Sequence, residues 1–119
     1  MTAHIQYPSL DSSEIASRNG EKITVPATMS HEIQSRILRD KLGYKGVTIS
    51  DALDMGAIAD HFTQEAALEN VFIAGVDIAL MPVSISAPAQ ASRLPTLIAH
   101  IVDRVREGRI SEAEIDASV

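Results

Sequence analysis

Three short apolar segments alternate with amphipathic stretches along this chain of 119 residues, and this alternation limits the possible folds most strongly. The segments are residues 1–7, 45–50 and 76–81. Pro8 ends the first, Gly46 precedes the β-branched run of the second, and Gly75 and Pro82 flank the third. Strands that are apolar on both faces and separated by helices are typical of parallel β–α–β units. The sequence therefore predicts an α/β fold in which parallel strands alternate with helices and the strand carboxyl ends share one edge.

The stretches between these strands have the apolar spacing of helices that bury one face. Helices are expected over residues 30–42, from Thr63 to Gly75, from about Leu97 to Gly108, and from Ser111, which forms a capping box with Glu114. Residues 9–28 are rich in Ser, Asp, Asn, Gly and Pro and show no sustained period, so a long loop is expected there.

Composition and charge exclude several classes of function. The chain has ten Lys and Arg residues and sixteen Asp and Glu residues, which gives a net charge of −6. This charge argues against a nucleic-acid partner. The chain has no Cys, and its His residues lack the spacing of metal ligands, so a metal site is not expected. No cofactor is implied. No apolar run reaches the roughly 18 residues of a membrane span, and residues 1–8 are not expected to form a signal peptide.

Five stretches of the chain share their order and spacing with one family of enzymes. They are MTAHIQYP (1–8), PATMS (26–30), LRDKLGYKGVTISDALDMGAIA (38–59), AGVDIALMP (74–82) and GRISEAEIDASV (108–119). Together they resemble the second half of the catalytic (β/α)8 TIM barrel of glycoside hydrolase family 3, of the bacterial β-N-acetylglucosaminidase type. The segment SDALDM after a G-x-T-I strand is the most specific of these motifs.

The resemblance implies that the three strands are strands six to eight of the barrel. Residues 1–119 would then be the C-terminal portion of the catalytic domain, because a complete barrel takes about 250 residues. It further implies a fragment of a retaining enzyme that releases terminal β-linked N-acetylhexosamine, for instance from peptidoglycan fragments. The family's acid/base pair and most of its sugar-binding residues lie on earlier loops and are absent here. We therefore expect the isolated fragment to be inactive.

Asp51 matches the nucleophile of the family motif. A carboxylate at the carboxyl end of a barrel strand lies on the face that carries the active site. There its charge stabilises an oxocarbenium-like transition state, and its oxygen forms the covalent glycosyl intermediate. Spacing alone fits an Asp that caps the following helix at least as well. Asp54 is not expected to be catalytic, because the second carboxylate of such an i, i+3 pair is more often solvated.

Three further residues are candidates for contact with the sugar. His4 either orients the sugar or Asp51, or is a strand-end His whose hydrogen bonds go to the backbone. Met55 either packs under the sugar or fills a gap in the core. His61 follows the nucleophile loop and is a candidate to line the site. Asp77 is at the start of the third strand, which is the end of the sheet opposite to Asp51. We therefore expect Asp77 to stabilise the fold and not to take part in catalysis.

The sequence is also compatible with two other functions. The alternatives are a family-3 β-glucosidase and a non-catalytic half-barrel that acts as an interaction module. A carbohydrate substrate is expected, and the exposed sheet edges predict self-association or pairing with the missing half of the barrel. The long loop after the first strand and the segment IADHF (58–62) resemble secreted or lipid-anchored family members, so a cell-envelope or secreted location is favoured over a cytoplasmic one.

Overall fold

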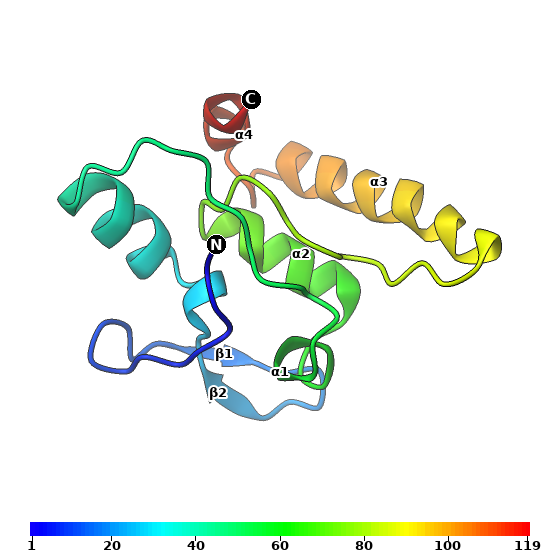
Figure 1. The fold of residues 1–119 in the computed structure, drawn as a ribbon, viewed down its shortest axis with the longest axis horizontal. Helices are drawn as coiled ribbons and strands as arrows, with labels where there is room; N and C mark the ends of the chain where they lie inside the picture. The colour runs from blue at the N-terminus through cyan, green and yellow to red at the C-terminus, as the bar shows by residue number, and fades with distance from the viewer.

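Helices form most of the regular structure in the computed structural model, which describes all residues from 1 to 119 (Figure 1). The elements are β1 (Glu14–Ala16), β2 (Lys22–Thr24), η1 (Ala27–Met29), η2 (Glu32–Lys41), α1 (Gly56–Ala59), α2 (Gln64–Ile73), η3 (Pro88–Ser92), α3 (Arg93–Arg106) and α4 (Glu112–Ser118). The protein is thus a small α/β domain. None of its helices combines the length and hydropathy that a membrane-spanning segment needs.

The expected helices are confirmed in position, with local differences. The first, η2, is a π-helix, in which the Leu42 N–H donates to the Ile37 carbonyl five residues earlier at 2.9 Å. At the start of α2 the Thr63 hydroxyl accepts the Ala66 N–H at 3.2 Å, as its capping position requires. Gly75 ends this helix with φ of +87°, a conformation that favours glycine. The capping box expected at Ser111 is not formed, because that side chain makes no capping hydrogen bond.

The three expected strands are not regular strands, and this part of the sequence prediction is not confirmed. Residues 45–50 and 76–81 meet in one isolated parallel bridge, Ile49 with Ile78. The Ile78 N–H donates to the Thr48 carbonyl at 3.0 Å, and the Ser50 N–H donates to the Ile78 carbonyl at 2.9 Å. Residues 1–7 reach this pair through the Thr2 N–H, which donates to the Ile49 carbonyl at 2.8 Å. Short parallel pairing is weak when a segment lacks neighbours on both sides, which explains the incomplete ladder.

The expected loop over residues 9–28 contains the only regular sheet, and the loop prediction is corrected accordingly. β1 and β2 form an antiparallel hairpin in which Ile15 lies opposite Ile23. Both isoleucines pack against the core. The connecting turn contains Asn19 and Gly20, and Gly20 has φ of +87°. An Asn-Gly pair between short alternating runs is a hairpin signal that the sequence analysis missed.

The core surrounds α2, which lies in the middle of the molecule with α3 on one side and η1 and the hairpin on the other (Figure 1). Its buried apolar members are Val25, Met29, Leu53, Ile58, Phe62, Ala67, Leu68, Val71, Val76, Val83 and Leu97. Several apolar side chains of the strand segments stay outside this core. Val47 is 65% exposed and Ile78 is 47% exposed. An apolar pocket of about 380 Å³ also lies between α3 and the segment around Ile78.

Candidate active site

Asp51 lies two residues after Ile49, which forms the bridge with Ile78, and it is half-buried. Its Oδ1 accepts the Ala52 N–H at 2.9 Å, and its Oδ2 accepts no hydrogen bond from the chain. No Lys, Arg or His forms an ion pair with it. One carboxylate oxygen is therefore held by the backbone while the other is available to a bound molecule.

Ser50 fixes the backbone at Asp51. Its side chain is completely buried, and its hydroxyl donates to the Asp51 carbonyl at 2.8 Å. The same hydroxyl accepts the Leu80 N–H at 2.9 Å. This one hydroxyl thus joins the Asp51 segment to the neighbouring segment, 30 residues later in the chain. Sequence analysis did not identify Ser50, because a serine before a turn gives no sign of its tertiary partner.

His4 lies beside the next peptide unit. Its Nε2 is 2.9 Å from the Ala52 carbonyl oxygen, and its Nδ1 is 3.0 Å from the Thr28 hydroxyl. Both ring nitrogens of His4 are therefore engaged by the protein. The structure thus places His4 against the backbone of the residue after Asp51. Thr28, which is completely buried, carried no signal in the sequence.

Met55 and His61 both lie in the segment after Asp51, and neither forms a hydrogen bond with it. Met55 is 44% exposed and precedes α1, and its N–H donates to the Ala52 carbonyl at 3.2 Å. The carbonyl of His61 accepts the Arg18 N–H at 2.7 Å, which ties this segment to the hairpin turn. The half-buried His61 ring lies edge-on to Phe62.

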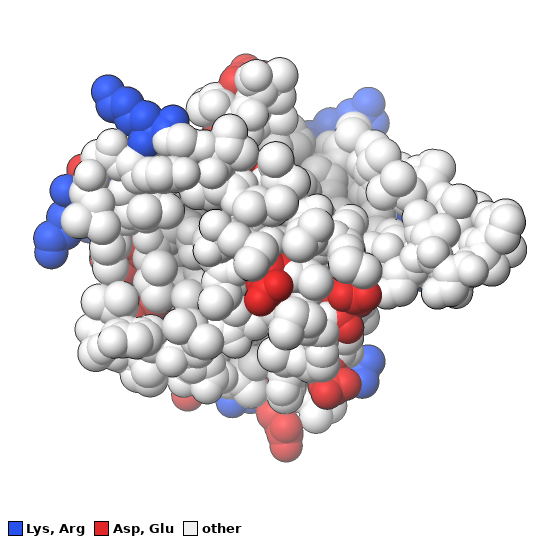
Figure 2. Space-filling view, viewed as in Figure 1, with Lys and Arg blue, Asp and Glu red and all other residues white.

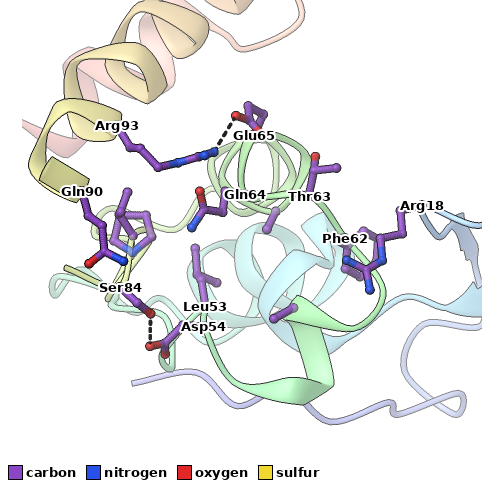
Figure 3. Close-up of a pocket in the computed structure, with 14 residues that line it drawn as sticks. Arg18, Leu53, Asp54, Phe62, Thr63, Gln64, Glu65, Ser84, Gln90 and Arg93 are labelled. Atoms are coloured by element: carbon purple, nitrogen blue, oxygen red, sulfur yellow. Dashed lines mark hydrogen bonds and ion pairs between the residues drawn. The ribbon is translucent and has the colours of Figure 1, made fainter. Parts of the chain in front are cut away.

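The largest pocket of the chain, about 610 Å³, is separate from Asp51, which is not among its lining residues. Asp54 lines this pocket instead, and its exposed carboxylate accepts the Ser84 hydroxyl at 2.7 Å (Figure 3). On another wall Arg93 pairs with Glu65 at 3.6 Å. The two aspartates of SDALDM therefore face different surroundings. The predicted nucleophile Asp51 thus lies outside the largest cavity, and Asp54 lies inside it.

Acidic side chains gather near the middle and lower part of the face seen in Figure 2, while Lys and Arg lie at its margins. No three His, Cys, Asp or Glu side chains lie close enough together to hold a metal ion. The chemistry that the arrangement at Asp51 offers is that of a carboxylate with one free oxygen.

Asp77 lies at the other end of the bridged segments. Its side chain is 9% exposed and pairs with Arg39 at 2.6 Å. Burial raises the pKa of Asp77, but hydrogen bonds from Thr48 and Ser118 and the charge of Arg39 outweigh it and hold the pKa below its ordinary value. This position agrees with the stability role expected from the sequence.

One family model and several known proteins are similar to this chain over its whole length. The family model described as "Glycosyl hydrolase family 3 N terminal domain" matches residues 1–119. The chain is 44% identical over 119 residues to Beta-hexosaminidase A of Pseudoalteromonas piscicida, covering all of this chain and 20% of that protein. It is 24% identical over its whole length to a Beta-N-acetylglucosaminidase/beta-glucosidase of Cellulomonas fimi, of which it covers 19%.

Among solved structures, the β-N-acetylglucosaminidase from Thermotoga maritima superposes with a TM-score of 0.72 and 28% identity. The match covers 99% of this chain and 22% of that one. The chain therefore spans about a fifth of the length of these relatives.

Proposed function

The chain belongs to glycosyl hydrolase family 3, and we propose that it is the C-terminal portion of the catalytic (β/α)8 domain of a retaining β-N-acetylhexosaminidase. The 44% identity to a β-hexosaminidase supports this specificity. The proposed substrates are carbohydrates that end in β-linked N-acetylglucosamine, such as peptidoglycan fragments. The activity belongs to the longer enzyme, and the isolated chain is inactive because it lacks an acid/base group for the leaving oxygen.

The proposed barrel assigns residues 1–7, 45–50 and 76–81 to strands six, seven and eight. The hydrogen bond from Thr2 to Ile49 and the parallel bridge from Ile49 to Ile78 support this order. In the complete barrel each segment has a neighbour on both sides, which completes the ladder that the isolated segments leave partial. The exposed side chains of Val47 and Ile78 support pairing with the remainder of the barrel.

The proposed nucleophile is Asp51, and the observation that carries this assignment is its free Oδ2 on a backbone fixed by buried Ser50. In a retaining glycosidase, the carboxylate attacks the anomeric carbon while a general acid protonates the leaving oxygen. Water then cleaves the glycosyl ester with net retention. Asp51 forms the ester, and the acid comes from the part of the enzyme outside this chain.

The other proposed site residues surround this carboxylate. Of the two functional roles expected for His4, its hydrogen bond to the Ala52 carbonyl supports orientation of the Asp51 segment. Met55, which is 44% exposed, offers an apolar surface to the sugar ring. His61 lies after α1 in the segment between Asp51 and α2 and is the third proposed contact of the sugar. A β-glucosidase is the second candidate, because the relative from Cellulomonas fimi carries both activities in its name.

Covalent trapping in the full-length enzyme tests the proposal. A 2-fluoro or 5-fluoro glycoside with a good leaving group accumulates the glycosyl ester, and peptide mapping locates the added mass. We expect the label on Asp51. A label on any other residue would refute the assignment.

The rates of hydrolysis of an aryl β-N-acetylglucosaminide and an aryl β-glucoside by the full-length enzyme decide between the two specificities. We expect the β-N-acetylglucosaminide to be hydrolysed faster.

A further inference from the structure

Three hydrogen bonds link the N-terminal segment, η1 and the Asp51 loop. The Thr2 hydroxyl donates to the Thr28 hydroxyl at 3.3 Å, and the Thr28 hydroxyl lies 3.0 Å from Nδ1 of His4. On the other side of the ring, Nε2 lies 2.9 Å from the Ala52 carbonyl oxygen. The groups joined in this way are 24 to 48 residues apart in the sequence. Thr28 is completely buried, so water does not replace its hydroxyl as a partner for the ring.

The direction of each hydrogen bond follows from the chemistry of the groups. A carbonyl oxygen only accepts, so the Ala52 carbonyl requires a proton on Nε2 of His4. In the neutral imidazole Nδ1 is then the acceptor, and the Thr28 hydroxyl donates to it. The Thr28 oxygen in turn accepts the proton of Thr2. In this arrangement every donor in the chain of hydrogen bonds has an acceptor, and His4 carries its proton on Nε2.

This network meets the backbone at the residue after the proposed nucleophile. The Ala52 carbonyl accepts from His4 and also from the Met55 N–H, while the Asp51 carbonyl accepts from Ser50. Two consecutive carbonyls are thus held by side chains, one by that of the adjacent Ser50 and one by that of His4 in the N-terminal segment. The peptide unit between them, whose N–H also holds Asp51 Oδ1, has little freedom to rotate.

We propose that Thr28 and His4 are positioning residues for Asp51, with Thr28 selecting the imidazole tautomer and His4 fixing the Ala52 carbonyl. This inference rests on the proposed function of Asp51. A nucleophile must approach the anomeric carbon along a narrow path, and a misplacement of about 1 Å costs on the order of 100-fold in rate. Loss of the Thr28 hydroxyl leaves Nδ1 of the half-buried His4 without its donor, so the ring rotates or changes tautomer and releases the loop.

The test uses the full-length enzyme with Thr28→Val, which keeps the shape of the side chain and removes the hydroxyl. We expect kcat to fall by about 10- to 100-fold while KM changes by less than about threefold, because the sugar contacts are retained. Thr28→Ser restores the donor, and we expect it to recover most of the activity. Thr24→Val is the matched control, since the Thr24 hydroxyl makes no hydrogen bond. Its activity should equal that of the parent enzyme.

A second pair of variants keeps the proposal falsifiable if Thr28→Val fails to fold. His4→Gln retains a donor that can reach the Ala52 carbonyl, and His4→Leu does not. We expect the Gln variant to be the more active of the two, again in kcat and not in KM. Full kcat in a folded Thr28→Val, or equal kcat in the two His4 variants, would overturn the positioning role.

The failure of this inference differs from the failure of the proposed function. If the trapped sugar maps to another residue than Asp51, the proposed function fails whatever the Thr28 variants do. If it maps to Asp51 while Thr28→Val keeps full kcat, the function stands and the positioning role fails.

Discussion

The carboxylate of Asp77 accepts two hydrogen bonds from Thr48, one from its backbone N–H at 2.7 Å and one from its hydroxyl at 2.9 Å. The Thr48 hydroxyl also accepts the Asp77 N–H at 3.1 Å, so the two residues bind each other reciprocally. Arg39 and Ser118 complete the coordination of the carboxylate at 2.6 and 2.7 Å. This cluster joins η2, α4 and the two bridged segments at the end opposite to Asp51.

Replacing Asp77 by Asn should destabilise the protein substantially. The amide keeps one acceptor oxygen but turns an NH2 group toward the donors of Thr48 and Arg39. We expect a loss of about 2–4 kcal/mol in the free energy of unfolding, less than for a fully buried pair because the Arg39 side chain is 28% exposed. Urea denaturation followed by circular dichroism measures it. The control is Asp103→Asn, which breaks the exposed pair with Arg106 and should cost less than about 0.5 kcal/mol. Equal losses in both variants would contradict the assigned role.

The contribution of Asp77 should also depend on pH in a defined direction. Its pKa in the folded protein is lowered from 3.8, so the folded state binds the carboxylate proton less tightly than the unfolded state. The resulting stability is fully present above the unfolded-state pKa and is lost as pH falls through the folded-state pKa. The stability difference between the parent and Asp77→Asn should therefore be constant near neutral pH and shrink below pH 3.8. A difference that grows on acidification would show that the cause is not this carboxylate.

Sequence reasoning located the helices well because their signals are local. Thr63 and Gly75 mark the two ends of α2, and the residues between them are mostly apolar. The strand segments were recognised as apolar, but whether they form a ladder depends on neighbours that local pattern does not specify. The hairpin was missed although Asn19 and Gly20 carry a turn signal, because its strands have only three residues each.

In the candidate site, too, the sequence indicates the residue that belongs to a local motif and not the residues whose role depends on tertiary contacts. Asp51 is predicted as the nucleophile from its motif, and the structure places it two residues after the bridged Ile49. Ser50 and Thr28 were not identified, because their importance lies in tertiary partners. The partner of the Ser50 hydroxyl, the Leu80 N–H, is 30 residues away, and that of Thr28, the His4 ring, is 24 residues away. Neither residue type nor spacing indicates such a contact.

The isolated chain should associate with itself. Val47 and Ile78 are exposed on incompletely paired segments, and an apolar pocket of about 380 Å³ lies next to Ile78. Unpaired strand edges and apolar surface favour pairing with another copy. We expect sedimentation velocity to show dimers or larger species whose proportion rises with concentration. The variant Val47→Lys should lower that proportion, and Lys45→Arg, which preserves charge, should not. A monomer at high concentration with a cooperative thermal transition would refute this expectation.

The strongest kinetic contrast should lie between the two aspartates of the motif in the full-length enzyme. Asp51→Asn keeps the size of the side chain and an oxygen for the Ala52 N–H, but an amide neither forms the glycosyl ester nor supplies charge to the oxocarbenium ion. We expect kcat/KM for an aryl β-N-acetylglucosaminide to fall by several orders of magnitude, each factor of ten being about 1.4 kcal/mol of transition-state stabilisation.

Asp54→Asn is the matched control for this loss, because it makes the same chemical change three residues away. Asp54 faces the separate 610 Å³ pocket, where its carboxylate accepts from Ser84, and an amide oxygen can still accept that hydroxyl. Its kcat/KM should therefore fall by less than about tenfold, since a surface group outside the reacting centre contributes little to the transition state. Melting temperatures of both variants should match that of the parent, which separates lost chemistry from lost fold. If Asp54→Asn is the more damaged enzyme at equal stability, the nucleophile is not Asp51.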